Sequence, residues 1–324
     1  MTQPTLEVRG LKTHFFTRAG AVKAVDGVDF AVAPGEVMGL VGESGSGKSI
    51  TGFSVIGLIE PPGRIVEGSV RFMGEELVGA PERRLRALRG DRIAMIFQDP
   101  MMTLNPVLRI DTQMIEAIRA HRTMDRDEAR DRAWEGLAAV GIPAPEQRLS
   151  AYPHQLSGGM RQRVAIAIAF LNEPDLIIAD EPTTALDVTI QAQIIHEAQQ
   201  LCRKTGTAMI WITHDLAVVA GLADHISVMY AGRIVEQGSV DDVIDRPAHP
   251  YTLGLLGSVP SANERGARLH QIPGMPPNVL NLPPGCPFRE RCPFETSVCA
   301  TEPGITEEQG RAFRCHHPRI GVPA

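Results

Sequence analysis

The chain has 324 residues, of which 43% are hydrophobic and 22% are charged. This composition is close to that of soluble globular proteins, so a mostly disordered chain is excluded, and the length is enough for roughly two domains. The 38 acidic and 32 basic residues give a formal net charge of −6, which argues against nucleic acid as a partner held by bulk positive charge.

The sequence shows neither a membrane span nor a secretory signal. The longest apolar run, Val164–Leu171, is far shorter than the roughly 18 residues that indicate a span. The first residues lack the basic and apolar stretches of a signal peptide. We therefore expect an intracellular protein that is soluble or attached to a membrane only through partners.

Short apolar segments predict the strands of an α/β protein. Three early candidates alternate and are rich in valine and phenylalanine: Leu6–Leu11, Val22–Val32 and Ser69–Met73. Five others are compact apolar runs, which are typical of strands buried on both faces of a parallel sheet. These are Glu36–Val41, Ile93–Phe97, Leu176–Ala179, Met209–Thr213 and Ile226–Tyr230.

Between about residues 99 and 172 the pattern predicts a helical insertion. Asp125–Val140 has a helical period, and Met160–Leu171 forms a second helix that stops near Pro174. After Ser258, prolines that include Pro260 indicate an extended linker. We expect one domain over residues 1–258, and a linker with a C-terminal extension over residues 259–324. An extension with so little periodicity should bury little surface, and it should need a staple, meaning a cross-link such as a bound metal, to be ordered.

A glycine-rich segment after the Glu36–Val41 strand has the spacing of a phosphate-binding loop. Its residues are Gly42, Glu43, Ser44, Gly45, Ser46, Gly47, Lys48 and Ser49. The glycines let backbone N–H groups face an anion, and the start of the helix expected to follow adds positive charge. Lys48 can reach the β- and γ-phosphates of a nucleotide, and Ser49 can ligate Mg²⁺. The alternative is a chance glycine turn, against which the strand and helix context argues.

Two carboxylates follow the Leu176–Ala179 strand. Asp180 would hold Mg²⁺ directly or through water, and Glu181 would act as general base on the attacking water. A strand that ends in an acidic loop is common, so the pair by itself is weak evidence. Together with the phosphate loop it indicates a nucleotide-hydrolysing site.

The stretch Leu156–Arg163 resembles the signature motif of ATP-binding cassette (ABC) ATPases, with Met160 where many members have glutamine. Ser157 and the N–H groups of Gly158 and Gly159 stand at an expected helix start and can bind a γ-phosphate. The resemblance extends over essentially the whole chain. It implies a P-loop cassette with a RecA-like parallel-sheet core, an antiparallel β subdomain and a helical insertion.

The same resemblance implies further site residues. Phe15 would stack on adenine, with a strand core position as the alternative, and Gln98 and His214 would join Glu181 as the catalytic set. The full set implied for ATP is Phe15, Gly42, Glu43, Ser44, Gly45, Ser46, Gly47, Lys48, Ser49, Ile50, Gln98, Asp180 and His214. Magnesium would be held by Ser49, Gln98 and Asp180.

In ABC ATPases two cassettes pack head to tail, so that each phosphate loop faces the partner's signature motif. The residues implied to act on the partner's nucleotide are Ser157, Gly158, Gly159, Met160 and Asp187, the last within the Ala185–Asp187 loop that crosses the interface. One cassette without a long coiled-coil insertion argues against a soluble ABC ATPase of DNA repair or translation, which is the rival interpretation.

The segment Arg246–Thr252 resembles the tail motif of oligopeptide and dipeptide importers. The resemblance implies a D-type ATPase subunit that pairs with a related F-type subunit beneath two permeases, on the cytoplasmic face of the inner membrane. An extracytoplasmic binding protein would supply the cargo indirectly. Nickel and glutathione importers share this tail, so the cargo stays open.

Four cysteines crowd the extension, at Cys286, Cys292, Cys299 and Cys315. The chain has no cysteine pair at the two-to-four-residue spacing of zinc ribbons and fingers. Four cysteines can bind a [4Fe–4S] cluster, and related importer ATPases carry one in this tail. We therefore expect an iron–sulfur cluster that acts as a staple, with zinc and free thiols as alternatives. Cys202 is expected to be structural.

Overall fold

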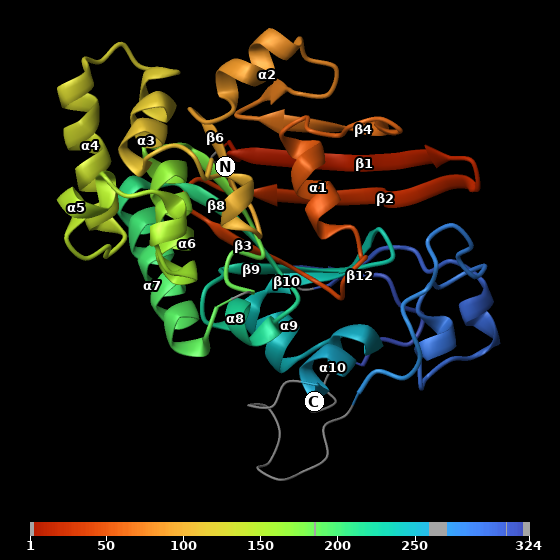
Figure 1. Cartoon of the computed structure of the whole chain (residues 1–324). Coiled ribbons are helices and arrows are strands. Elements are labelled where there is room, and N and C mark those ends of the chain that lie inside the picture. The colour runs from red at the N-terminus through yellow and green to blue at the C-terminus, as the bar shows by residue number, and fades with distance from the viewer. Residues whose placement is uncertain (1–2, 185, 259–270, 309, 320–324) are drawn as a thin grey trace.

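The computed structural model describes residues 3–184, 186–258, 271–308 and 310–319. Two sheets form the centre of the molecule, and a group of helices stands to one side (Figure 1). The strands are β1 Leu6–Thr17, β2 Gly20–Val32, β3 Val37–Val41, β4 Gly63–Phe72, β5 Glu75–Glu76, β6 Ile93–Ile96, β7 Leu176–Asp180, β8 Ala208–Thr213, β9 His225–Tyr230, β10 Arg233–Ser239, β11 Thr306–Glu308 and β12 Arg311–Phe313. The α-helices are α1 Lys48–Val55, α2 Glu82–Leu88, α3 Ile110–Arg119, α4 Arg126–Ala139, α5 Pro145–Leu149, α6 Gly158–Phe170, α7 Val188–Thr205, α8 Leu216–Ala220, α9 Val240–Asp245 and α10 Pro250–Gly257.

The smaller sheet is antiparallel and has the order β2-β1-β4-β5. Strand β1 continues six residues beyond the predicted end at Leu11 and pairs with both β2 and β4. Its register shifts near Gly10, whose backbone has φ +55. Such a bulge interrupts the alternation of apolar and polar residues, so the pattern predicts too short a strand.

The larger sheet has the order β11-β12-β10-β9-β3-β8-β7-β6. Its strands from β9 to β6 are parallel, as predicted from their apolar runs. Every residue of β3, β7 and β8 is buried, because helices or the other sheet cover both faces. Strands β10 and β12 lie beyond β9 in the strand order and run antiparallel to their neighbours, and they were not predicted.

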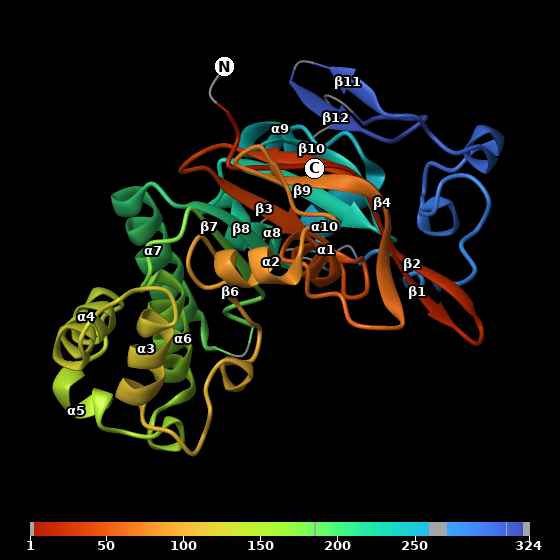
Figure 2. The ribbon, with the colours of Figure 1, turned by 90° about the horizontal axis from the view of Figure 1, so that it is seen from above.

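The predicted helical insertion is present between β6 and β7. Helices α3 to α6 gather beside the edge of the larger sheet that β6 forms (Figure 2). Helix α4 begins at a capping box in which Asp125 and Glu128 bond each other's backbone N–H groups. Ile110, Met114 and Leu137 are fully buried between these helices. The helices of the insertion therefore pack against one another around buried apolar side chains.

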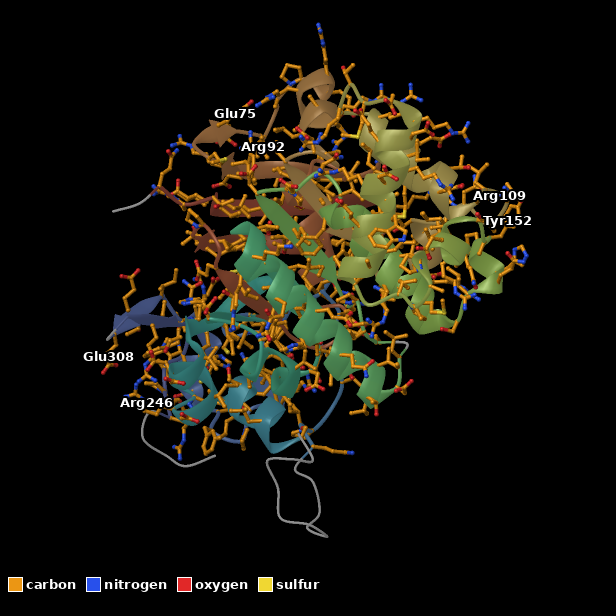
Figure 3. All side chains as sticks on the ribbon, turned by 90° about the vertical axis from the view of Figure 1, so that its left-hand side faces the viewer. Glu75, Arg92, Arg109, Tyr152, Arg246 and Glu308 are labelled. Carbon is orange, nitrogen blue, oxygen red and sulfur yellow. The ribbon has the colours of Figure 1, made fainter. Side chains whose placement is uncertain are left out.

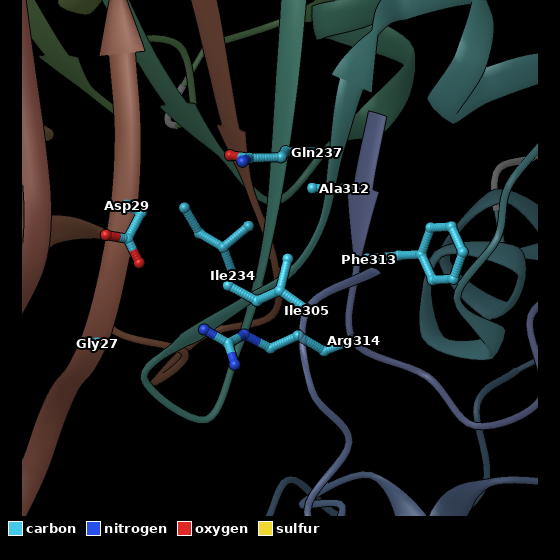
Figure 4. A pocket seen from close by; sticks show the side chains of 8 residues that line it. All are labelled: Gly27, Asp29, Ile234, Gln237, Ile305, Ala312, Phe313 and Arg314. Carbon is cyan, nitrogen blue, oxygen red and sulfur yellow. The ribbon is translucent and has the colours of Figure 1, made fainter. Parts of the chain in front are cut away.

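The C-terminal extension packs onto the larger sheet through β12, which pairs with β10 at Glu236 and Gln237. Figure 4 shows the junction with β2, where a gap of about 20 Å³ has room for about one water molecule. Its lining residues are Gly27, Asp29, Ile234, Gln237, Ile305, Ala312, Phe313 and Arg314. The extension therefore buries side chains of its own, contrary to the expectation from its irregular sequence.

Phe288 is the main apolar anchor of the extension. Its side chain is 2% exposed, and its ring centroid lies 5.3 Å from that of Tyr230 and 5.4 Å from that of Tyr251. His249 completes the aromatic cluster at 5.8 Å, and burial lowers the pKa of its imidazole to about 3. The proline-rich linker predicted around Pro260 lies outside the described residues. In the part of the chain that is described, no helix has the length and hydrophobicity to cross a membrane.

We expect Phe288→Ala to lower the free energy of unfolding by about 3–5 kcal/mol, because it leaves a cavity among three aromatic rings. Equilibrium denaturation with urea measures this loss. Val298→Ala, in the same extension but 45% exposed, is the control and should change stability by less than about 0.5 kcal/mol. Equal effects of both substitutions would contradict the anchoring role of Phe288.

Candidate functional site

A cleft of about 890 Å³ opens at the carboxyl ends of the parallel strands. Ligand sites of open α/β sheets lie at this edge, outside the strand ends. The residues that line the cleft are Phe15, Val22, Ala24, Glu43, Ser44, Gly45, Gly47, Lys48, Ser49, Ile50, Gln98, Glu181, His214, Pro276 and Val279. Most of the residues expected to contact a nucleotide are thus in one place.

The phosphate loop is held so closely by its neighbours that two of its glycines have no room for a side chain. A Cβ atom on Gly42 would lie 2.2 Å from the carbonyl oxygen of Met229, and one on Gly47 would lie 2.2 Å from that of Ala24. Gly47 also has φ +105 and caps the start of α1. The backbone N–H groups of the α1 N-terminus are therefore available to an anion.

Lys48 is fixed inside this loop, and its side chain is 4% exposed. Its Nζ donates hydrogen bonds to the carbonyl oxygens of Gly42 (2.7 Å) and Glu43 (3.0 Å). It also lies 3.9 Å from Oε1 of Glu181. Burial lowers the pKa of Lys48, while the carboxylates of Glu181 and Asp180 oppose this shift. The cation therefore stands between the loop and the end of β7.

Asp180, the last residue of β7, and Glu181, the residue after it, take different partners. Oδ1 of Asp180 accepts a hydrogen bond from Oγ of Ser49 at 2.9 Å, and burial raises the pKa of Asp180 despite that bond. Oε2 of Glu181 accepts from Oγ1 of Thr184 at 2.9 Å and lies 3.3 Å from Nδ1 of His214. Glu181 has φ +44, a strained conformation for a residue other than glycine, and such strain clusters at functional sites.

Gln98 and Phe15 border the same cleft from other elements. Gln98 follows β6, while Phe15 lies in β1 and packs against Gly63 at the start of β4. Phe15 is only partly buried, so it is not a core residue of the small sheet. Its place in the cleft wall favours the functional interpretation over the core alternative.

The signature motif does not line this cleft. Oγ of Ser157 caps α6 by accepting from the N–H of Met160 at 3.3 Å, and Ser157 is exposed. Asp187 caps α7 by accepting from the N–H of Ile190 at 3.0 Å. Ala185, in the same predicted loop, lies outside the described residues. A single chain thus presents these two helix starts to its surroundings.

Several contacts to the cleft were not expected from the sequence. The hydroxyl of Tyr251 accepts a hydrogen bond from the N–H of Glu43 at 2.8 Å, and Arg291 forms an ion pair with the carboxylate of Glu43. Pro276 and Val279 line the cleft from the C-terminal extension. More than 200 residues separate Glu43 from either of its partners, so no local pattern could indicate these contacts.

The four cysteines of the extension lie close enough to influence one another. Burial raises the pKa of the Cys286, Cys292 and Cys315 thiols, that of Cys315 to about 11, and charge on neighbouring thiols raises each of them further. The N–H of Cys286 also donates to the carbonyl oxygen of Cys299 at 2.9 Å. Among the described residues, however, no group of three or more His, Cys, Asp or Glu side chains is arranged to hold a metal ion. Cys202 is buried in α7, where burial raises its pKa to about 12.

Comparison with known proteins gives matches along most of the chain. Residues 25–184 match the family described as ABC transporter, and residues 235–299 match the oligopeptide/dipeptide transporter C-terminal region. The oligopeptide transport ATP-binding protein OppD of Salmonella typhimurium is 49% identical over 314 residues, which cover 97% of this chain and 93% of the relative. The corresponding protein AppD of Bacillus subtilis is 50% identical over 313 residues, 96% of this chain and 95% of its own length.

A solved structure shows the same fold at lower identity. A dimeric ATP-binding cassette in a post-hydrolysis state, bound to ADP and Pi, superposes with a TM-score of 0.66 and is 28% identical. The match covers 72% of this chain and 98% of that chain. The predicted P-loop cassette fold is therefore confirmed. The chain belongs to the ABC transporter family of ATP-binding proteins, in the group that carries the oligopeptide/dipeptide transporter C-terminal region.

Proposed function

We propose that this chain is the ATP-hydrolysing subunit that powers import of peptides across the cytoplasmic membrane. The observation that carries the proposal is the convergence of Lys48, Ser49, Asp180, Glu181 and His214 on one cleft. Relatives about half identical over nearly their full length are oligopeptide or dipeptide transport ATP-binding proteins. The alternative cargo is nickel or glutathione, since a different cargo would leave the ATP cleft unchanged.

The residues of the cleft divide the hydrolytic work in the proposed mechanism. Ser49 and Asp180, already joined by a hydrogen bond, would hold Mg²⁺ together with Gln98, and the ion would neutralise charge on the phosphate oxygens. Glu181 would take the proton of the attacking water. His214, beside Glu181, would contact the γ-phosphate. Lys48 would bind the β- and γ-phosphates.

A second cassette is needed in this proposal because the signature residues lie outside the chain's own cleft. Ser157 and Asp187 are both exposed at helix starts, and the adjacent Val188 is 80% exposed. Exposed helix N-termini of this kind suit a phosphate supplied by a partner. We propose a related F-type subunit as that partner, so that ATP is bound between the two chains.

The helical insertion offers a surface for two permease subunits. Met102 and Val107, between Gln98 and α3, are 72% and 74% exposed. Figure 3 labels Arg109 and Tyr152 close together at the outer side of the insertion, and the guanidinium carbon of Arg109 lies 5.9 Å from the centre of the Tyr152 ring. We propose that this surface receives the permeases at the cytoplasmic face of the membrane. An extracytoplasmic binding protein would act only through the permeases.

We propose that the four cysteines of the extension bind a [4Fe–4S] cluster, with zinc as the alternative. The support is the donor set itself, four free thiols between Cys286 and Cys315. The cluster would order the extension where the two ATPase subunits meet. It takes no part in the hydrolytic steps above.

Lys48→Ala should weaken ATP binding by about tenfold or more, because it removes the one ammonium group buried in the phosphate loop among the described residues. Titration of the full chain with a fluorescent ATP analogue measures the dissociation constant. The matched control is Lys204→Ala at the exposed end of α7, which should bind as the unaltered chain does. Unchanged affinity in Lys48→Ala would contradict the assignment of the loop.

Glu181→Gln should keep ATP binding and lower turnover by about a hundredfold or more, as expected for loss of a general base. Both quantities are measured on the transporter reconstituted in vesicles, together with ATP-driven uptake of a labelled oligopeptide. Glu60→Gln, an exposed residue outside the cleft, is the control. Near-normal turnover in Glu181→Gln would overturn the role of Glu181. Uptake of nickel or glutathione in place of the peptide would overturn the cargo alone.

The chain purified without oxygen should contain about four irons and be brown, as a [4Fe–4S] cluster requires. Cys292→Ser should lose this iron, whereas Cys202→Ala should retain it, because Cys202 lies in α7. One zinc per chain and no colour would replace the cluster with a structural zinc site. If Cys292→Ser lost its iron and still assembled and transported normally, the role as a staple would be wrong.

A further inference from the structure

The second residue of the phosphate loop, Glu43, is held by the C-terminal part of the chain. Nη1 of Arg291 donates to Oε2 of Glu43 at 2.6 Å, and Nη2 donates to Oε1 at 3.0 Å. This is the bidentate geometry in which guanidinium and carboxylate pair most strongly. The hydroxyl of Tyr251 accepts from the N–H of the same residue. Both the backbone and the side chain of Glu43 are therefore fixed from outside the loop.

Arg291 is itself rigidly placed. It is 6% exposed, its Nε donates to the carbonyl oxygen of Pro273 at 2.9 Å, and its Nη1 also lies 3.3 Å from the hydroxyl of Tyr230. Its guanidinium carbon lies 5.9 Å from the centre of the Phe288 ring. The hydrogen bond to Glu43 raises the pKa of Arg291 above its usual range. Exposed ion pairs contribute little, but removing one partner of a pair as buried as this one leaves a charge uncompensated.

The charge of Glu43 reaches the position where phosphates bind. Its carboxylate acts on the pKa of Lys48, and Lys48 donates to the backbone carbonyl oxygen of Glu43. A carboxylate so near the phosphate-binding lysine would repel a polyphosphate unless a cation neutralised it. Among the described residues, Arg291 is the one cation that forms an ion pair with Glu43.

The segment that carries Arg291 also reaches the cleft directly. Pro276 and Val279, between Pro273 and Arg291 in sequence, line the cleft together with Phe15. The side chain of Leu280 lies 3.6 Å from the position that a Cβ on Gly20, the first residue of β2, would occupy. The extension therefore follows the cleft from its rim to the phosphate loop.

We propose that the C-terminal extension completes the ATP site of this chain, with Arg291 as a positioning residue that neutralises Glu43 and fixes the phosphate loop. The inference depends on ATP binding, and it is independent of the cargo, the partner subunit and the cluster. It assigns to the extension a part in nucleotide affinity that is separate from any role of its cysteines.

The test compares Arg291→Met, Glu43→Gln and the double variant in the full chain. Titration with a fluorescent ATP analogue should give about tenfold weaker binding for Arg291→Met, because the carboxylate of Glu43 is left without its cation. In the Glu43→Gln background, which lacks the carboxylate, adding Arg291→Met should change the affinity by less than about threefold, so the double variant should bind ATP more tightly than Arg291→Met alone. Arg289→Met is the matched control, since Arg289 lies in the same short helix but bonds to Pro284 and Glu295.

Restoration by the second substitution is the readout that a merely structural arginine would not give. If the double variant binds ATP as weakly as Arg291→Met, or if Arg291→Met binds normally, the proposal is wrong. If Arg291→Met does not fold, Arg291→Lys replaces it, because lysine keeps the positive charge and loses only the bidentate geometry. The affinity of Arg291→Lys for ATP should then fall by less than about threefold. A larger loss of affinity in a folded Arg291→Lys protein would contradict the claim that Arg291 acts by neutralising Glu43. Normal binding by Lys48→Ala would instead show that the ATP site itself is misassigned.

Discussion

The order of the parallel strands is the constraint on which the chemistry of this chain depends. Strands β3, β8, β7 and β6 are neighbours and run in one direction, so their carboxyl ends share one edge of the sheet. The phosphate loop follows β3, Gln98 follows β6, Glu181 follows β7 and His214 follows β8. Residues up to about 170 positions apart thus meet because the sheet brings the strand ends together.

The parts of the fold that the sequence predicts are those with a local cause. Each central strand is an uninterrupted apolar run because it is buried on both faces, and the phosphate loop is recognised because its function requires fixed spacing within eight residues. The bulge at Gly10 and the packing of Phe288 have no such local cause. The pair of Arg291 and Glu43 is visible only in the folded chain, since 248 positions separate its members.

The signature motif shows why one chain is an incomplete catalyst in the proposed mechanism. Its serine and glycine pair stand at the start of α6, in the helical insertion, whereas the phosphate loop stands at the centre of the larger sheet. Both are helix N-termini with N–H groups available to an anion, and a single triphosphate can satisfy both only if two chains face each other. Binding of ATP and assembly of the site are then one event, which links the nucleotide to movement of the attached permeases.

The ionic contacts of the phosphate loop explain how ATP could set the catalytic groups in place. Lys48 is shared between two loop carbonyls and the carboxylate of Glu181. A triphosphate carries more negative charge than one carboxylate, so it would draw Lys48 toward itself and release Glu181 to accept a proton from water. Thr184 and His214 also contact that carboxylate, so it retains partners at the cleft when Lys48 leaves it. At the other end of the loop, Arg291 prevents Glu43 from competing with the phosphates for Lys48. The two ion pairs therefore behave differently when ATP binds. The pair of Lys48 and Glu181 is exchanged for contacts to the phosphates, whereas the pair of Arg291 and Glu43 must persist.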